Sequence, residues 1–300
     1  HAMYAQTNSG TLSDGYLAGN TAVGYFAMAG DEGIINTAEG STAVGTNALK
    51  DLSTGNNNSA VGAGALMATT TGQNNAALGT SSLLRNTSGS HNIAVGRYAL
   101  SNNTEASGNV AVGSYALLNN NGTGTFTSEN GISWDNGASN VAVGNSSLAG
   151  NTSGSFNTAI GAGTLEKNTT AINNVAVGIN GLTKNINGGD NTALGAYALE
   201  NQTSNVNGNV AVGSHALRNN DTGGGNTALG SWSLHNTTYG FHNVAVGENS
   251  GKELTGSGSS KNTFIGHNAN TISGTILTNA AAIGADAIVT ASNTIQLGST

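Results

Sequence analysis

Residues 109–117 read Asn-Val-Ala-Val-Gly-Ser-Tyr-Ala-Leu, and residues 209–217 read Asn-Val-Ala-Val-Gly-Ser-His-Ala-Leu. The pattern of Asn, Thr or Val, Ala, an aliphatic residue and Gly, followed by a small residue and Leu, recurs along most of the 300-residue chain. Its glycines are Gly24, Gly45, Gly62, Gly79, Gly96, Gly113, Gly144, Gly161, Gly178, Gly195, Gly213, Gly230, Gly247, Gly266, Gly284 and Gly298. Nine of the fifteen intervals between them are 17 residues, so the chain is an internal repeat.

A repeat of 17 residues is shorter than helical-hairpin, ankyrin or leucine-rich repeats. Each unit offers two short runs separated by Asn, Gly, Thr and Ser, and apolar residues do not recur with helical spacing. The sequence therefore predicts an all-β fold, a parallel β-solenoid of about sixteen short coils over residues 20–300. Residues 1–19 are expected to be a tag remnant and a capping segment.

Side chains alternate between two faces along the first run of each repeat. Val110 and Val112 point one way, whereas Ala111 and Gly113 point the other. We expect the branched residues and the Leu after the motif, such as Leu117, to be the two core positions of a coil. The Ala and Gly form a flat face that lets another backbone approach closely. This gives a structural role to Gly62, Gly79, Gly96, Gly113, Gly144 and Gly161.

Asn is almost as common as Gly, with 45 and 46 residues. One Asn stands four residues before most motif glycines, and stacking would align these side chains in a ladder of amide hydrogen bonds. The ladder includes Asn92, Asn109, Asn157 and Asn174. Proline would remove a backbone donor from any coil, and the chain has none.

A single coil buries too little to be stable alone. Two aliphatic side chains contribute about 2 kcal/mol each, whereas ordering each residue costs more than about 1 kcal/mol. The flat face or the branched face is therefore expected to pack against other chains, and a homotrimer is the favoured assembly.

The composition excludes several functions. Eight Lys and Arg residues cannot form the basic surface that binds nucleic acid. The chain has no Cys for disulfides or thiolate metal sites and no apolar run long enough for a membrane helix. Six His and fifteen acidic residues are scattered without a catalytic motif. We expect no enzyme activity, cofactor or metal.

The position two residues after the motif Gly is often aromatic. Stacking would place these residues on neighbouring coils, either as an exposed strip for sugar rings or a protein partner, or as filling between protomers. They are Phe26, Tyr98, Tyr115, Tyr197, His215 and Trp232.

The 31-residue interval between Gly113 and Gly144 contains an inserted loop at about residues 119–137. It carries Phe126 and Trp134, and we expect either a binding loop or a brace between protomers.

The run from Asn109 to Leu117 resembles the head repeats of YadA-like trimeric autotransporter adhesins and the related repeat arrays of phage tail fibres. The resemblance covers roughly residues 20–300, although the 17-residue period is longer than that of the adhesins and the Leu is an addition. It implies a left-handed, trimeric parallel β-roll, either intertwined or side by side. It also implies an extracellular adhesive fibre, on a cell surface or virion, that binds a host glycan or protein.

Two alternatives remain at this point. An ice-binding solenoid would use the column three residues before the motif Gly, where Thr is frequent but is interrupted by Val, as at Val110 and Val141. A purely structural spacer would use the aromatic strip and the loop as protomer contacts.

Overall fold

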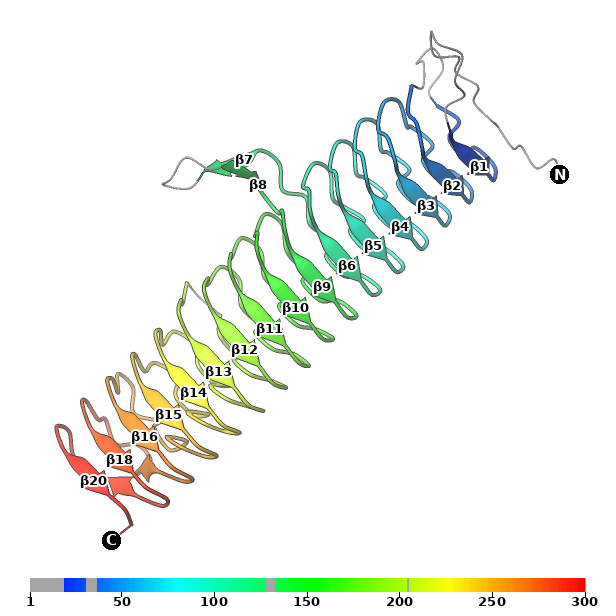
Figure 1. Ribbon diagram of the computed structural model, residues 1–300. Coiled ribbons are helices and arrows are strands. Elements are labelled where there is room, and N and C mark those ends of the chain that lie inside the picture. Colours follow the sequence, from blue (N-terminus) through cyan, green and yellow to red (C-terminus); the bar gives the residue numbers. More distant parts are fainter. Residues whose placement is uncertain (1–18, 31–36, 128–132, 204, 300) are drawn as a thin grey trace. The chain divides into compact units, whose positions relative to one another are not determined.

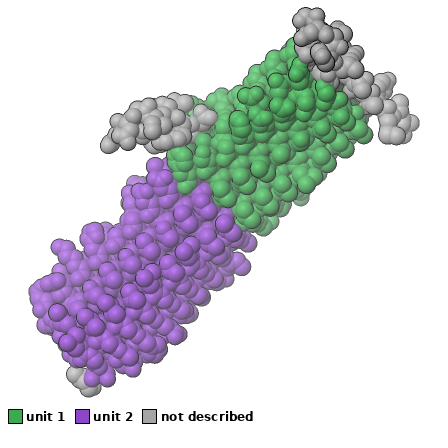
Figure 2. All heavy atoms as spheres, viewed as in Figure 1, with its two compact units in different colours: residues 1–156 green, residues 157–300 purple. Residues whose placement is uncertain are grey.

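The computed structural model describes residues 19–30, 37–127, 133–203 and 205–299. Within these ranges every regular element is a β-strand, and the predicted all-β parallel solenoid is confirmed (Figure 1). Residues 1–18, expected to be a tag remnant and a cap, lie outside the described residues. The chain divides into two compact units, residues 1–156 and 157–300, shown in two colours in Figure 2.

Each coil contributes one strand of three residues to a parallel sheet. In the first unit these strands are β1 (Thr21–Val23), β2 (Thr42–Val44), β3 (Ser59–Val61), β4 (Ala76–Leu78), β5 (Ile93–Val95), β6 (Val110–Val112) and β9 (Val141–Val143). In the second they are β10 (Thr158–Ile160), β11 (Val175–Val177), β12 (Thr192–Leu194), β13 (Val210–Val212), β14 (Thr227–Leu229), β15 (Val244–Val246), β16 (Thr263–Ile265), β18 (Ala281–Ile283) and β20 (Ile295–Leu297).

Equivalent residues of successive coils lie opposite one another. Ala94 pairs with Ala111 in the first unit, and Ala211 pairs with Ala228 in the second. The second run of each repeat forms no strand in most of the described coils. Among the described residues, two coils have a second strand, β17 (Asn270–Thr271) and β19 (Ile288–Val289), and these two strands pair in parallel.

In the other coils the second run is a series of tight turns. In the coil that contains β12, Asp190, Tyr197 and Leu199 have φ angles of 57°, 60° and 52°. This left-handed conformation recurs at the same positions along the array. Residues other than Gly, Asn and Asp usually avoid the left-handed conformation. Because a strand requires an extended backbone, these left-handed residues keep the second run from forming one.

The prediction that the branched residues of the strand point into the core is wrong, because the opposite side of the strand is buried. In most strands the central residue is a buried Ala and the flanking residues lie outward, as in Ala211 between Val210 and Val212. The reason is the thinness of the coil, because a Cβ placed on Gly181 would lie only 3.7 Å from the Cβ of Ala176. At that separation the methyl group of Ala already fills the space beneath the strand, whereas β16 accommodates Phe264 because Gly251 lies against its ring. The Leu after the motif is buried as predicted.

The motif glycines make the close backbone approach that their pattern predicts, but they make it between successive coils of one chain. Gly195 has a φ of 140°, and a Cβ there would lie 2.5 Å from the carbonyl oxygen of Gly213. Both the angle and the contact require Gly. The flat face is therefore internal and unavailable to a partner.

The predicted Asn ladder is confirmed. The Oδ1 of Asn92 accepts hydrogen bonds from the backbone N of Asn109 at 3.0 Å and from its Nδ2 at 3.3 Å. Asn174 bonds Asn157 in the same way. A second buried ladder, seven residues after the motif Gly, was not predicted, and within it the Nδ2 of Asn103 donates to the Oδ1 of Asn86 at 2.8 Å.

Candidate functional site

The largest candidate surface is the outward side of the parallel strands, which we call the outer face. The residue just before the motif Gly is aliphatic in every coil. This column comprises Val23, Val44, Val61, Leu78, Val95, Val112 and Val143 in the first unit, and Ile160, Val177, Leu194, Val212, Leu229, Val246, Ile265, Ile283 and Leu297 in the second. Leu78 is 51% exposed and Leu229 is 38% exposed. Because neighbouring strands lie about 4.8 Å apart, the column is contiguous within each unit.

The second column of the outer face is the one that contains Thr. It is three residues before the motif Gly and holds Thr, Ser, Ala, Val or Ile. Neither column carries a charged residue. An uncharged apolar surface of this extent is typical of a protein contact. Of the two faces of the strands, the outer face is therefore the one available for other chains.

The aromatic residues lie on neighbouring coils, as the repeat predicts. In the first unit the rings of Tyr98 and Tyr115 are stacked, with centroids 5.6 Å apart and planes inclined by 20°. The guanidinium of Arg97 lies 4.8 Å from the Tyr98 centroid. This pair forms a short aromatic strip with a cation beside it.

A longer strip in the second unit consists of Tyr197, His215 and Trp232. The His215 ring lies 5.1 Å from Tyr197 and 4.4 Å from Trp232, and it is nearly parallel to the indole. Arg218 lies 5.2 Å from the Tyr197 centroid, and the Nζ of Lys252 lies 5.1 Å from the Trp232 centroid. The rings thus cover each other's faces, and mainly their edges remain for a ligand.

The backbone does not favour aromatic residues at these positions. Tyr197, His215 and Trp232 have φ angles of 60–61°, a conformation that costs an ordinary residue about 1–2 kcal/mol. Other coils place Asn, Gly, Ser or Asp at the same position, as at Asn180 and Asn249. Ring stacking contributes about 0.5–1.5 kcal/mol per pair and offsets part of this cost.

His235 adds a further ring beside Trp232 at the end of the strip. Its ring is 4.4 Å from that of Trp232, and its Nδ1 lies 2.8 Å from the Oδ1 of Asn236. Because an amide oxygen only accepts, Nδ1 carries the hydrogen. Burial lowers the pKa of His235 below its ordinary value of 6.5, and burial followed by the charge of Arg218 lowers the pKa of His215. Both rings are mainly neutral at pH 7.

The inserted loop contains a hairpin. Strands β7 (Thr125–Thr127) and β8 (Ser133–Asp135) pair in antiparallel fashion, and Phe126 lies opposite Trp134 in the register. The side chains of these two strands and residues 128–132 lie outside the described residues. The binding role predicted for Phe126 and Trp134 therefore stays a prediction.

Two features of other protein classes are missing from the described residues. No group of three or more His, Asp or Glu side chains is close enough to hold a metal ion there. The same residues include no helix of the length and apolarity needed to cross a membrane. No protein-family model matches the chain, and no curated protein matches it.

Proposed function

We propose that the chain forms the shaft or head of a homotrimeric surface fibre, on a phage tail or a bacterial cell, that binds a host-surface glycan or protein. The observation that supports this proposal is the outer face, where every coil presents an outward aliphatic residue, exposed in most coils and half-buried in the others, and no charge. Such a surface is stabilised when another chain covers it.

A second copy of the chain is the partner that fits this face best. Its own outer face repeats at the same strand spacing, so Val, Leu and Ile of one copy meet Thr, Ala and Val of another at every coil. The contact grows with each added coil, and stable interfaces bury about 1,200–2,000 Å². Three copies side by side leave the aromatic strips as candidate receptor contacts.

A trimer also explains how weak receptor contacts would suffice. Three identical sites on one particle raise the local concentration of the second and third contacts. Receptor binding then requires no chemistry and no cofactor, and the site of action is extracellular. A purely structural spacer would share the trimer but not the receptor.

The oligomeric state tests the proposal directly. Light scattering of the purified protein should give three times the chain mass of 29.5 kDa. Leu229→Asp, which places a charge on the outer face, should shift the mass toward that of the monomer. Thr170→Asp, at an exposed turn, is the matched control and should leave the trimer intact. A parent protein of 29.5 kDa would refute the assembly.

The outer face also favours ice binding as a second candidate. Thr158, Thr192 and Thr227 point outward from stacked strands, as an array that orders water would require. Val175 and Val210 interrupt the Thr column, which weakens this alternative. Because a trimer would cover the same surface, thermal hysteresis together with a monomeric mass would favour ice binding over the fibre.

A further inference from the structure

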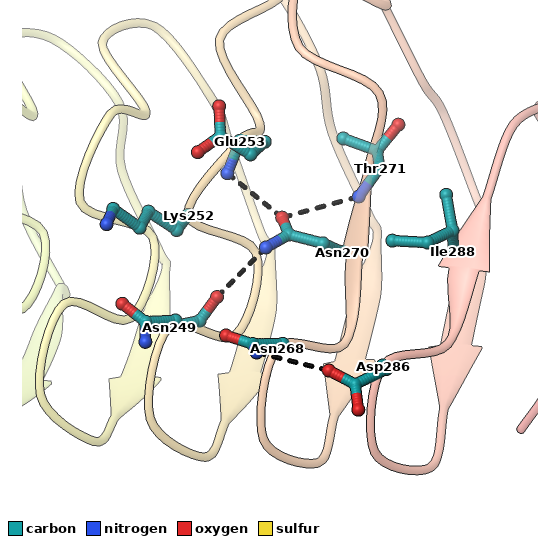
Figure 3. A pocket seen from close by; sticks show the side chains of 8 residues that line it. All are labelled: Asn249, Lys252, Glu253, Asn268, Asn270, Thr271, Asp286 and Ile288. Atoms are coloured by element: carbon teal, nitrogen blue, oxygen red, sulfur yellow. Dashed lines mark hydrogen bonds between the residues drawn. The ribbon is translucent and has the colours of Figure 1, made fainter. Parts of the chain in front are cut away.

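The second unit contains a pocket directly beyond the aromatic strip. The position that holds Trp232 is occupied in the following coils by Asn249, Asn268 and Asp286. Beside these residues lies a pocket of about 410 Å³, whose lining also includes Lys252, Asn270 and Thr271 (Figure 3). This volume lies within the range of about 300–1,000 Å³ usual for small-molecule sites.

The pocket occurs where the repeat loses its buried Leu. Four residues after the motif Gly, the next two coils have Gly251 and Asn270 instead. A Cβ on Gly251 would lie 2.9 Å from the ring of Phe264, which replaces the usual strand Ala and is fully buried. Phe264 thus fills the core space that Leu leaves. Asn270 places an amide where other coils have an aliphatic side chain.

The amide of Asn270 is held in a fixed orientation. Its Nδ2 donates to the carbonyl oxygen of Asn249 at 3.0 Å, and its Oδ1 accepts from the backbone N of Glu253 at 2.9 Å (Figure 3). Beside it, the Nδ2 of Asn268 donates to the Oδ1 of Asp286 at 3.1 Å. These bonds order the polar side chains before any ligand arrives, which reduces the entropy cost of binding.

Two polar groups of the lining lack partners within the described part of the chain. The Oγ1 of Thr271 is buried and has no hydrogen-bond partner there. The ammonium of Lys252 forms no ion pair among the described residues. Because Lys252 both lines the pocket and lies over Trp232, it connects the pocket to the aromatic strip.

We propose that this pocket binds a saccharide. Amide, carboxylate and ammonium groups together supply the donors and acceptors that sugar hydroxyls need. Trp232 borders the pocket through Lys252, whose ammonium lies 5.1 Å from the indole centroid. The inference deepens the proposed fibre function, since it gives the host glycan a binding site. Its ligand class is a neutral sugar, because the lining has one ammonium, on Lys252, and two carboxylates, on Glu253 and Asp286, and this excess of negative charge disfavours an anionic sugar.

The chain offers a built-in reporter for this site. It has only two Trp residues, so Trp134→Phe leaves Trp232 as the single tryptophan in the full-length protein, and excitation at the red edge of the indole band selects it over the Tyr residues. Titration with glucose, galactose and N-acetylglucosamine should give a saturable change of Trp232 emission for at least one sugar, with a Kd in the millimolar range. Ligand-observed saturation-transfer NMR with the same sugars gives a second readout that does not depend on the indole.

Asn268→Ala should weaken binding of that sugar at least tenfold, and Asp286→Ala should do the same. Asn180→Ala is the matched control, because Asn180 occupies the same repeat position with a φ of 52°, against 53° for Asn268, and does not line the pocket. It should bind as the parent does. Equal losses in Asn180→Ala and Asn268→Ala would overturn the assignment.

The outcome also separates this proposal from the fibre proposal. No saturable signal in either readout would overturn the saccharide site, even if the protein is a trimer. Saturable binding that depends on Asn268 in a monomeric protein would support the site and refute the trimeric fibre.

Discussion

The buried Asn ladder leads to a quantitative prediction for Asn226→Ala. The Asn226 side chain is fully buried. Its Nδ2 donates to Asn209 Oδ1 at 3.2 Å and to the Gly240 carbonyl at 2.7 Å. Its Oδ1 accepts from the backbone N and the Nδ2 of Asn243 at 2.9 and 3.1 Å. Replacing it with Ala removes all four bonds at once.

Each bond contributes about 0.5–1.5 kcal/mol, so the four together predict a loss of about 2–6 kcal/mol. The upper part of that range is favoured because the Gly240 carbonyl and the Asn243 backbone N lose these partners inside the coil. Asn201→Ala is the control, since the Asn201 side chain is partly exposed and makes a single ladder bond, to Asn219 at 3.0 Å. Its predicted cost is below about 1 kcal/mol.

The measurement is urea unfolding followed by tryptophan fluorescence in the Trp134→Phe background. Trp232 lies in the same coil as Asn226, six residues later, so its emission reports unfolding of the perturbed coil. Asn226→Ala should lower the urea midpoint clearly more than Asn201→Ala does. Equal midpoints for the two variants would refute the view that the internal ladder stabilises the solenoid.

Three further predictions can be checked on the same protein. Gly195→Ala should lower the melting temperature far more than Gly208→Ala, because a Cβ at Gly208 meets nothing within 4 Å; similar losses would contradict the close-approach argument. Since burial lowers the pKa of His235, its folded state binds a proton less readily than the unfolded chain, and stability should fall as pH decreases below about 6.5. His235→Gln should reduce that pH dependence, and an unchanged profile would exclude His235 as its source. Because Leu229→Asp should separate the copies and uncover the remaining aliphatic residues of the outer face, it should increase binding of a hydrophobic dye, as measured by fluorescence at matched protein concentration; unchanged dye binding would contradict the covered face.

The sequence predicts the coil and its internal ladder because both depend only on spacing. A constant period places equivalent residues opposite one another, so the Asn92 to Asn109 bonds and the stacking of His215 on Trp232 follow without knowledge of the coil's cross-section. The turn residues Asn and Gly also agree with the left-handed angles observed.

The inward face of the strand could not be derived in this way. Alternation separates Val110 from Ala111, but it does not say which one points inward. The answer depends on the distance between the two walls of the coil, which is set by turns at Tyr115 and Leu117 that bend back with φ angles of 60° and 49°. Residue size alone favours Val in the core, and the thin interior reverses that preference.

The saccharide pocket had a sequence signal that is visible in retrospect. The Leu column ends at Leu234, and Gly251 and Asn270 follow at the same position. The compensating change is Phe264 in the strand. Only the structure shows that the two substitutions occupy neighbouring volumes, because Gly251 and Phe264 belong to different coils.

The hairpin of β7 and β8 shows how this architecture accepts new sequence. Across the inserted loop, the backbone N of Asn140 still donates a hydrogen bond to the Oδ1 of Asn109 at 2.9 Å. The Nδ2 of Asn151 likewise donates to the Oδ1 of Asn120 at 2.8 Å. Both ladders therefore continue as if the extra residues were absent. This corner is a natural insertion point, where a foreign peptide or a small domain could be grafted while the coils on either side keep their register.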